Sequence, residues 1–285
     1  MNPTAPNPLR YAWMVVCLLF PVALLNYLDR QMLATMKASM VGDIPSIANR
    51  ADWGLILGSF KWTYALLSPF AGYVADRLGR RYVIAASLFV WSAVTWWTGH
   101  VGSFHELVAA RALMGVSEAF YIPAALALIS EYHFGETRSR AVGLHQTGIY
   151  CGQILGGFAG YMADSPDHGW RWMFSTCGMI GVIYAIPLLG AMRDPVRATQ
   201  EMVTSLLPTG HATIARVASD LGTNRRTLHR QLAARGTSFT EILDASRRAL
   251  VETYLADGSR SLTDIAGLLG YASLSAFSRW RHRHG

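Results

Sequence analysis

Apolar and polar positions divide the chain into two parts that meet near residue 195. In the first part, apolar residues form long stretches with few charges. A helix needs about 20 mostly apolar residues to cross the hydrocarbon core of a bilayer. Six stretches meet this requirement and predict six transmembrane helices, at Tyr11–Leu28, Trp53–Ala75, Tyr82–Gly99, Leu107–Tyr132, Ala141–Met162 and Trp172–Met192.

Beyond residue 200 the pattern changes to that of short soluble helices. Two similar segments appear, His211–Leu232 and Ser261–Trp280. Each has the pattern of a helix, a turn that contains glycine, and a second helix. Gly222 and Gly270 follow the first helix of each segment, where a positive φ angle is common. We therefore predict two helix-turn-helix units.

These patterns predict an all-α protein. A six-helix membrane domain is expected over residues 1–192, a short linker over 193–199 and a soluble double helix-turn-helix domain over 200–285. The N-terminus lacks the basic segment of a signal peptide, and the first apolar stretch is too long for one. We expect that stretch to remain as a membrane helix.

Composition and charge support a membrane location and indicate an orientation. Hydrophobic residues make up 52% of the chain and charged residues only 15%, against about 25% charged in soluble proteins. Basic residues favour the cytoplasmic side of a membrane. Eight arginines fall on one side of the predicted helices: Arg10, Arg77, Arg80, Arg81, Arg138, Arg140, Arg193 and Arg197. Four basic residues fall on the other: Arg30, Lys37, Arg50 and Arg171. Both ends of the six-helix domain are therefore predicted to face the cytoplasm, in the inner membrane of a cell.

Several kinds of chemistry find no support in the sequence. The three cysteines, Cys17, Cys151 and Cys177, all lie in apolar stretches, so no disulfide framework is expected. There is no metal-ligand spacing, no phosphate-binding loop and no nucleophile with an accompanying base. We expect neither an enzyme nor a bound metal or cofactor.

The segment between the second and third predicted helices is rich in glycine and charge, and reads GYVADRLGRR from Gly72 to Arg81. It resembles the loop that joins helices 2 and 3 in the major facilitator superfamily. The resemblance implies that Gly72 and Gly79 allow tight packing. It also implies a charge network that biases a cytoplasmic gate, formed by Asp76, Arg77, Arg80 and Arg81.

Charged residues inside the predicted helices narrow this resemblance. The first helix ends in NYLDR, which includes Asp29 and Arg30, and the fourth contains Arg111 and Glu118 in RALMGVSEAFYIP. These motifs are similar to those of anion:cation symporters that take up hexuronates, galactonate and related organic anions. In that group, matching arginines bind a carboxylate and matching acidic residues carry protons. Ionisable residues within a membrane helix are functional candidates by default, although the same residues could form structural ion pairs.

The chain departs from these symporters in one respect. The family has two six-helix halves, with the substrate site between them. Only the first half is recognisable here, so a lone copy is not expected to transport. A second copy or a separate transporter half would be needed, with an organic anion as the ligand.

The tail resembles the AraC-type DNA-binding domain over residues 201–285, in which a long helix joins two helix-turn-helix units. The resemblance implies that segments 224–233 and 273–283 enter the major groove of double-stranded DNA. The candidate contacts are Asn224, Arg225, Arg226, His229, Arg230, Ser273, Ser275, Arg279 and Arg283. Such side chains contact either bases or phosphates. Arg281 stands where the family usually has an aromatic residue, and the family's short final helix is missing. The second helix-turn-helix unit is therefore expected to be less stable or to bind DNA more weakly than the first.

Three hypotheses remain open. The chain could be a membrane-anchored AraC-type transcription regulator whose transporter-like half senses an organic anion. It could be a truncated anion and proton transporter half with a passenger DNA-binding tail. It could also be a gene fusion without a joint function. The short predicted linker would keep the tail close to the anionic lipid headgroups, which attract arginine and repel DNA.

Overall fold

The computed structural model describes residues 8–133, 135–165, 168–192, 195–233, 235–257 and 260–284. Every regular element in this described part is helical. The chain divides into two compact units. The six-helix unit is Ala12–Met192, and the C-terminal unit is Arg193–Gly285 together with Met1–Tyr11. Each unit is described by itself.

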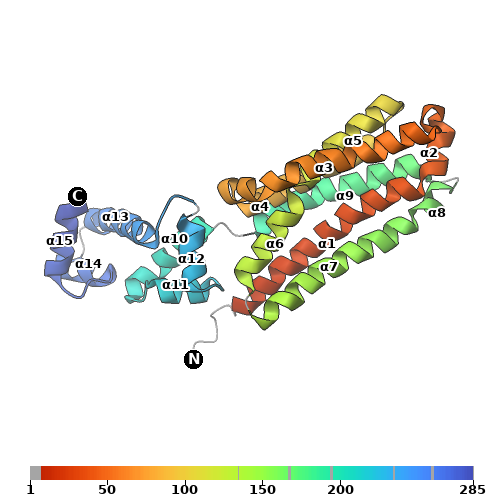
Figure 1. Ribbon diagram of the computed structural model, residues 1–285. Helices are drawn as coiled ribbons and strands as arrows, with labels where there is room; N and C mark the ends of the chain where they lie inside the picture. The colour runs from red at the N-terminus through yellow and green to blue at the C-terminus, as the bar shows by residue number, and fades with distance from the viewer. Residues whose placement is uncertain are drawn as a thin grey trace. The chain divides into compact units, whose positions relative to one another are not determined.

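The six-helix unit contains a long helix at each of the six predicted stretches (Figure 1). Their bounds are α1 (Pro8–Thr35), α3 (Arg50–Leu78), α4 (Arg80–Thr98), α5 with α6 (Phe104–Glu118 and Tyr121–Tyr132), α7 (Glu136–Gly157) and α9 (Gly169–Ala191). Three short elements connect them: α2 (Lys37–Asp43), η1 (Pro45–Ile47) and α8 (Ala159–Ala163).

Two helices differ from the prediction in a way that affects the site. The first was expected to end at Leu28, but α1 continues to Thr35 because Asp29 and Arg30 are enclosed by the bundle rather than exposed in a loop. The fourth is interrupted between α5 and α6 at residues 119–120. Pro123 has no N–H to donate to the carbonyl of Ala119, so the helix cannot continue unbroken there.

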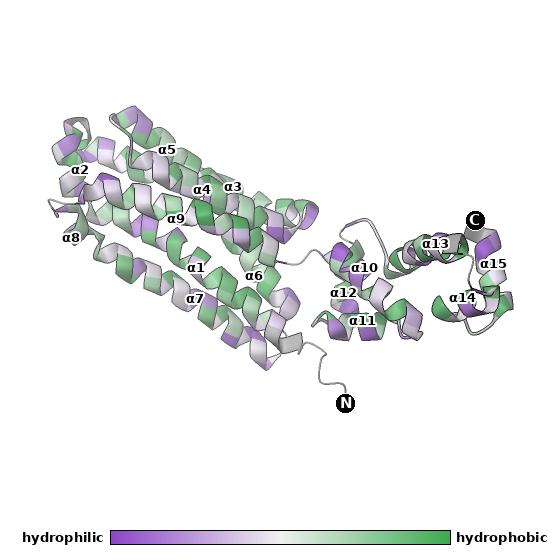
Figure 2. Ribbon diagram, turned by 180° about the vertical axis from the view of Figure 1, so that it is seen from behind, coloured by the Kyte–Doolittle hydropathy of each residue, from purple (hydrophilic) through white to green (hydrophobic). Residues whose placement is uncertain are grey.

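Three helical stretches are long and apolar enough to cross a membrane by length and composition, and they fall in α1, in α5 with α6, and in α9. The helices α3, α4 and α7 are of comparable length but contain more charged and polar residues, such as Lys61 in α3 and His145 in α7. Figure 2 shows hydrophobic residues along all six long helices. The prediction of six spans is therefore matched by six helices, of which three meet this hydropathy criterion.

Glycines bring these helices into close contact. A Cβ atom at Gly148 would lie 2.8 Å from the carbonyl oxygen of Phe20, and one at Gly156 would lie 2.7 Å from that of Leu28. The glycines Gly148, Gly152 and Gly156 form a stripe on α7. This α7 stripe packs directly on the backbone of α1, which runs beside it (Figure 1). Gly178 on α9 fits against Ser92 on α4 in the same way. Small residues commonly allow such approaches between helices in lipid.

The C-terminal unit consists of short helices. They are α10 (Pro195–Leu206), η2 (Leu207–Thr209), α11 (Ile214–Asp220), α12 (Arg225–Ala233), α13 (Phe239–Asp257), α14 (Leu262–Leu268) and α15 (Leu274–His284). The predicted linker over 193–199 needs correction, because residues 195–199 form the start of α10. Pro195 suits the first turn of a helix, and Thr199 and Val203 are buried along one face of α10. Residues 193 and 194 lie outside the described part.

Two apolar cores stabilise this unit. The first contains Val203 from α10, Leu228 from α12 and Phe239 from α13. The second contains Val251 from α13 and Phe277 from α15. One helix, α13, therefore contributes its first half to one core and its second half to the other.

Candidate functional site

The structure brings the four predicted charged residues of the six-helix unit together. Asp29 and Arg30 lie on α1, and Arg111 and Glu118 lie on α5. Arg30 donates from Nε to Glu118 Oε2 over 2.6 Å. Asp29, Arg111 and Glu118 are each no more than 3% exposed. Arg111 and Glu118 are seven positions apart, about two helical turns, and so face the same region.

Aromatic rings surround the two arginines. The Arg30 guanidinium lies 4.7 Å from the ring centre of Tyr27, 4.7 Å from that of Phe60 and 5.0 Å from that of Tyr64. The Arg111 guanidinium lies 4.6 Å from the same Phe60 ring. Ring faces attract cations, most strongly where water is excluded. Phe60 on α3 therefore stabilises both positive charges without neutralising either of them.

The cluster leaves polar atoms unsatisfied. The Arg111 side chain donates to Met114 Sδ over 2.8 Å, and its Nε atom has no hydrogen-bond partner. Within the described residues, Arg111 forms no salt bridge, although Asp29 and Glu118 interact with it electrostatically. Asp29 Oδ2 accepts from Thr95 Oγ1 over 3.1 Å, while Oδ1 is unpartnered. Glu118 Oε1 is unpartnered as well. Buried polar atoms usually have partners, so these atoms mark a place for water or a ligand.

Sequence reasoning missed three members of this site. Phe60 and Thr95 are in contact with it from α3 and α4. Asn26 lies on α1, four positions before Arg30, and is fully buried. An asparagine within an otherwise apolar helix was the signal that could have identified it, since an amide in lipid needs a partner.

The predicted gating loop forms most of the expected charge network. Gly79 has a φ angle of 90°, which favours glycine, and it separates α3 from α4. Arg80 Nη2 lies 2.7 Å from Asp76 Oδ1, and its Nη1 pairs with Glu131 on α6. Arg81 donates to the carbonyl of Met192 over 2.9 Å, at the end of α9.

The two remaining members of this loop contribute less to the network. Arg77 donates to the hydroxyl of Tyr73, one turn earlier on α3. A Cβ atom at Gly72 would meet nothing within 4 Å, so the tight packing implied for this glycine is not found within the unit. Lys61 is exposed on α3 and lies outside the charge cluster.

In the C-terminal unit, the two predicted helix-turn-helix segments repeat the same hydrogen bonds. The N–H of Thr223 donates to the carbonyl of Ala218 over 2.9 Å, and Tyr271 donates to Ala266 over the same distance. Both alanines are buried. The turn glycines also match, with φ angles of 74° at Gly222 and 76° at Gly270.

Side-chain caps extend this repeat. Thr213 caps α11 and Ser261 caps α14. Asn224 Oδ1 accepts from the N–H of Thr227 over 2.8 Å at the start of α12, and Ser273 Oγ accepts from the N–H of Ala276 over 3.3 Å in α15. Asn224 and Ser273 were predicted to contact DNA, and each has a side-chain oxygen already engaged as a helix cap.

The other predicted DNA contacts point away from the cores. The exposed residues are Arg225, Arg226, His229, Arg230, Ser275 and Arg279. Buried residues alternate with them on α12, as at Leu228 and Leu232. The side chain of Arg283 lies outside the described part of the structure.

The second helix-turn-helix segment, α14–α15, is held against α13 by polar and aromatic contacts. Trp280 donates from Nε1 to Asp244 Oδ1 over 3.0 Å, and Arg247 donates to the carbonyl of Leu269 over 3.1 Å. The Arg247 guanidinium lies 4.3 Å from the centre of the Tyr271 ring. Burial raises the pKa of Tyr271 to about 12. Trp280 thus supplies an aromatic contact beside Arg281, which is exposed.

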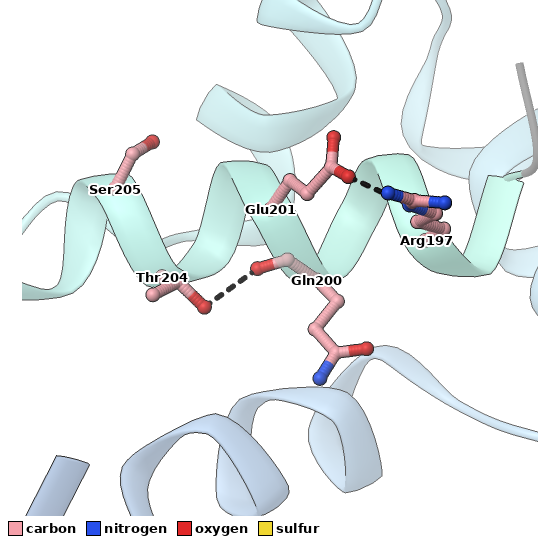
Figure 3. Close-up of a pocket in the computed structure, with 5 residues that line it drawn as sticks. All are labelled: Arg197, Gln200, Glu201, Thr204 and Ser205. Carbon is pink, nitrogen blue, oxygen red and sulfur yellow. Dashed lines mark hydrogen bonds and ion pairs between the residues drawn. The ribbon is translucent and has the colours of Figure 1, made fainter. Parts of the chain in front are cut away.

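A hollow on the surface of α10 is lined by polar side chains that mostly bond to one another. It is lined by Arg197, Gln200, Glu201, Thr204 and Ser205 (Figure 3). Arg197 Nε lies 2.9 Å from Glu201 Oε1, and Thr204 donates to the carbonyl of Gln200. Because these groups satisfy one another along a single helix, we do not consider this hollow a functional site.

Comparisons with known proteins point to membrane transporters. A family model described as Major Facilitator Superfamily matches residues 19–274. Protein spinster of Drosophila melanogaster is 31% identical over 192 residues, covering 67% of this chain and 31% of the relative. Protein spinster homolog 1 of Homo sapiens is 32% identical over 209 residues, covering 72% of this chain and 39% of the relative. The chain thus spans about a third of the length of these curated relatives.

A bacterial transporter and a solved structure are also similar. D-galactonate transporter of Escherichia coli is 26% identical over 183 residues, covering 64% of this chain and 42% of the relative. A crystal structure of a bacterial homolog of the human lysosomal transporter Spinster, inward-facing and occupied, has a TM-score of 0.59 at 21% identity. That comparison covers 93% of this chain and 73% of the solved chain, and its low identity supports the fold alone.

Proposed function

Because the chain belongs to the major facilitator superfamily and is a multi-pass membrane protein, we propose that its six-helix unit binds an organic anion together with a proton. The binding site is the charge cluster formed by α1 and α5. This proposal favours the transporter hypothesis over a regulator whose membrane part serves only as an anchor.

The observation that carries the proposal is the state of Arg111. It is a buried cation that forms no salt bridge within the described residues, although Asp29 and Glu118 lie near enough to interact with it electrostatically. A charge inside a membrane protein is costly unless another charge compensates for it. The carboxylate of an organic anion would supply the direct ion pair that Asp29 and Glu118 do not form with Arg111. The charge on Arg30 is already compensated by Glu118, so Arg111 is the arginine available to the anion.

The acidic residues supply a site for the proton. Protonation of Glu118 would weaken its ion pair with Arg30, and the oxygen atoms Asp29 Oδ1 and Glu118 Oε1 are unpartnered. Binding of the anion and the proton would therefore change the same network. Alternating access in transporters takes place between two repeats. Transport by this mechanism requires a second repeat, whereas binding does not.

Anion binding by the full-length chain tests this function. D-galactonate is a suitable probe because a similar protein transports it. In detergent, we expect saturable binding by calorimetry that weakens about tenfold to a hundredfold in Arg111→Gln, the usual effect of removing a charged hydrogen bond. The control is Lys61→Gln, which removes an exposed cation outside the cluster. Unchanged binding in Arg111→Gln, or an equal loss in Lys61→Gln, would rule out the proposed role.

A second function, sequence-specific DNA binding of the AraC type, is favoured by the repeated hydrogen bonds of the C-terminal unit. Two matched turns present α12 and α15, and both helices have exposed arginines. Arginines on such a helix bind guanine edges or phosphates. The chain would then be a membrane-anchored regulator with its two ends in the cytoplasm. This candidate has no support from the matched relatives and depends on the C-terminal unit alone.

Selection of bound duplexes from a random pool tests the second function, with the full-length chain in nanodiscs at physiological salt. We expect a defined motif to be enriched, and to be lost in Arg226→Ala or Arg279→Ala. Arg248→Ala, an exposed arginine on α13, serves as the control and should leave the motif unchanged. Binding that is weak, salt-sensitive and independent of DNA sequence would exclude the second function, and the proposed anion binding would be the only function left.

A further inference from the structure

The exposed surface of α12 carries positive charge that the C-terminal unit does not neutralise. Arg225, Arg226 and Arg230 are exposed on one side of this helix, which we call the arginine face. Leu228 and Leu232 lie on the other side, in the first apolar core. Within the described residues, none of the three arginines forms an ion pair.

The sequence around α12 explains why these charges remain unpaired. Residues 221–240 contain four arginines and no aspartate or glutamate. By contrast, Arg216 pairs with Asp220 and Arg247 pairs with Asp244, in each case about one helical turn away. Positive charge that is concentrated on one helix face and left unpaired attracts an anionic partner.

The covalent chain keeps α12 close to the membrane. Helix α9 ends at Ala191 and α10 begins at Pro195, so only a few residues separate the two helices. Three peptide steps join Met192 to Pro195 and span at most about 11 Å. Val203 of α10 and Leu228 of α12 belong to the same apolar core, which keeps their helices side by side. The arginine face is therefore within about 40 Å of the end of a membrane helix.

We infer that the arginine face of α12 binds the anionic phospholipid headgroups of the membrane that the chain spans. Headgroup phosphates form a continuous surface, so several arginines on one helix face can donate to them at the same time. The predicted orientation places the C-terminal unit on the cytoplasmic side, whose leaflet carries the anionic lipids. The inference goes beyond both proposed functions and requires neither of them.

The same three side chains are among the predicted DNA contacts, so docking on lipid would close this face to DNA. The bilayer is the partner that the tether favours, because a tethered group meets it at a high effective concentration. An anionic leaflet also repels DNA, which carries the same sign of charge. In the docked state, the C-terminal unit would not bind a duplex through α12.

Lipid quenching in nanodiscs tests this docking with the full-length chain. The reporter is a fluorophore at Ala233→Cys, an exposed position at the end of α12. The three native cysteines are replaced by alanine, so that only this position is labelled. Spin labels on a small share of the headgroups quench a fluorophore that lies at the lipid surface. One disc contains phosphatidylcholine alone, and the other contains equal parts of phosphatidylcholine and phosphatidylglycerol.

We expect strong quenching only in the anionic disc, and we expect salt to reverse it because ions screen the attraction. One arginine near an anionic surface raises the ratio of docked to undocked unit about fivefold, and three raise it about a hundredfold. Replacing Arg225, Arg226 and Arg230 together by glutamine should therefore lower that ratio about a hundredfold.

A second triple variant serves as the matched control. Arg248→Gln, Arg260→Gln and Arg281→Gln together remove the same charge from exposed positions outside α12. This variant should keep the quenching in the anionic disc.

Three outcomes would overturn the inference. Equal quenching of the unaltered arginine face in the two discs would show that lipid charge has no effect, whether or not either triple variant folds. An equal loss in the two triple variants would show an effect of net charge rather than of the arginine face. Duplex DNA bound through the three arginines, with no quenching in the anionic disc, would assign the face to DNA.

Discussion

Single glycines decide how closely the helices of the six-helix unit approach one another. Gly152 lies in the middle of the α7 stripe, and a Cβ atom there would collide with the carbonyl oxygen of Leu24. Gly143 lies on the same helix but faces open space, with nothing within 4 Å of such an atom. The two positions therefore separate the effect of packing from the effect of glycine on helix stability.

We expect Gly152→Ala to destabilise the unit by about 1–3 kcal/mol, the usual cost of forcing extra volume into a packed interface. Gly143→Ala should be neutral or slightly stabilising, since alanine favours a helix by about 1 kcal/mol over glycine. Thermal unfolding in a single detergent would measure both. Equal shifts in the two variants would contradict the close approach of α7 and α1.

For single residues, the sequence identifies the charged members of the candidate site better than the neutral ones. Asp29, Arg30, Arg111 and Glu118 stand out because charge is rare in apolar helices, and the structure brings all four together. Phe60 could not be selected from the sequence, because aromatic residues are common in such helices. Its role depends on its contact with two guanidinium groups, which only the folded chain defines.

At the scale of helices, the hydrophobic period locates most elements but not their interruptions. The break between α5 and α6 falls within one continuous apolar stretch, so hydropathy alone predicts a single helix there. The opposite error occurs at α10, whose polar residues suggested a linker. Helix α10 is nevertheless stable because Val203 lies in the first apolar core and Met202 packs against that core, a tertiary contact that a local pattern does not reveal.

The helix-turn-helix pattern illustrates what local sequence can specify. Glycine after a short helix and a capping residue before the next one are local signals, and both recur at matching places in α11–α12 and α14–α15. Which exposed side chains contact a partner is not a local property. Asn224 and Ser273 show this, since each uses its side-chain oxygen to cap a helix.

At the scale of the whole molecule, the basic segment between α3 and α4 lies at the end of the six-helix unit where α6 and α9 also end. Contacts join the start of α4 to the ends of α6 and α9, through Arg80 and Arg81. Contacts at the opposite end join α2 to α9, through Asp43 and Arg171. The sequence thus predicts which segments share a side, and the cytoplasmic assignment of that side stays a prediction.

Cysteine labelling in intact cells tests the orientation, in a background where the three native cysteines are replaced by alanine. Ala51→Cys lies near the start of α3, and Ser139→Cys lies in the first turns of α7; both positions are exposed. We expect an impermeant maleimide to label Ala51→Cys in intact cells and Ser139→Cys only after lysis, because basic segments stay inside. The reverse pattern would place both ends of the unit outside.

The contrast between the three strongly apolar helices and the three more polar ones bears on how the chain is made. A lysine at the centre of a helix adds about 2.5–3.5 kcal/mol to the cost of insertion by the translocon. Helix α3, which contains Lys61, is therefore a poor candidate to leave the translocon alone. The apolar helices α1, α5–α6 and α9 lie on both sides of the polar ones in the chain. During synthesis, each polar helix is thus expected to enter the lipid alongside an apolar neighbour, so that assembly begins before translation ends.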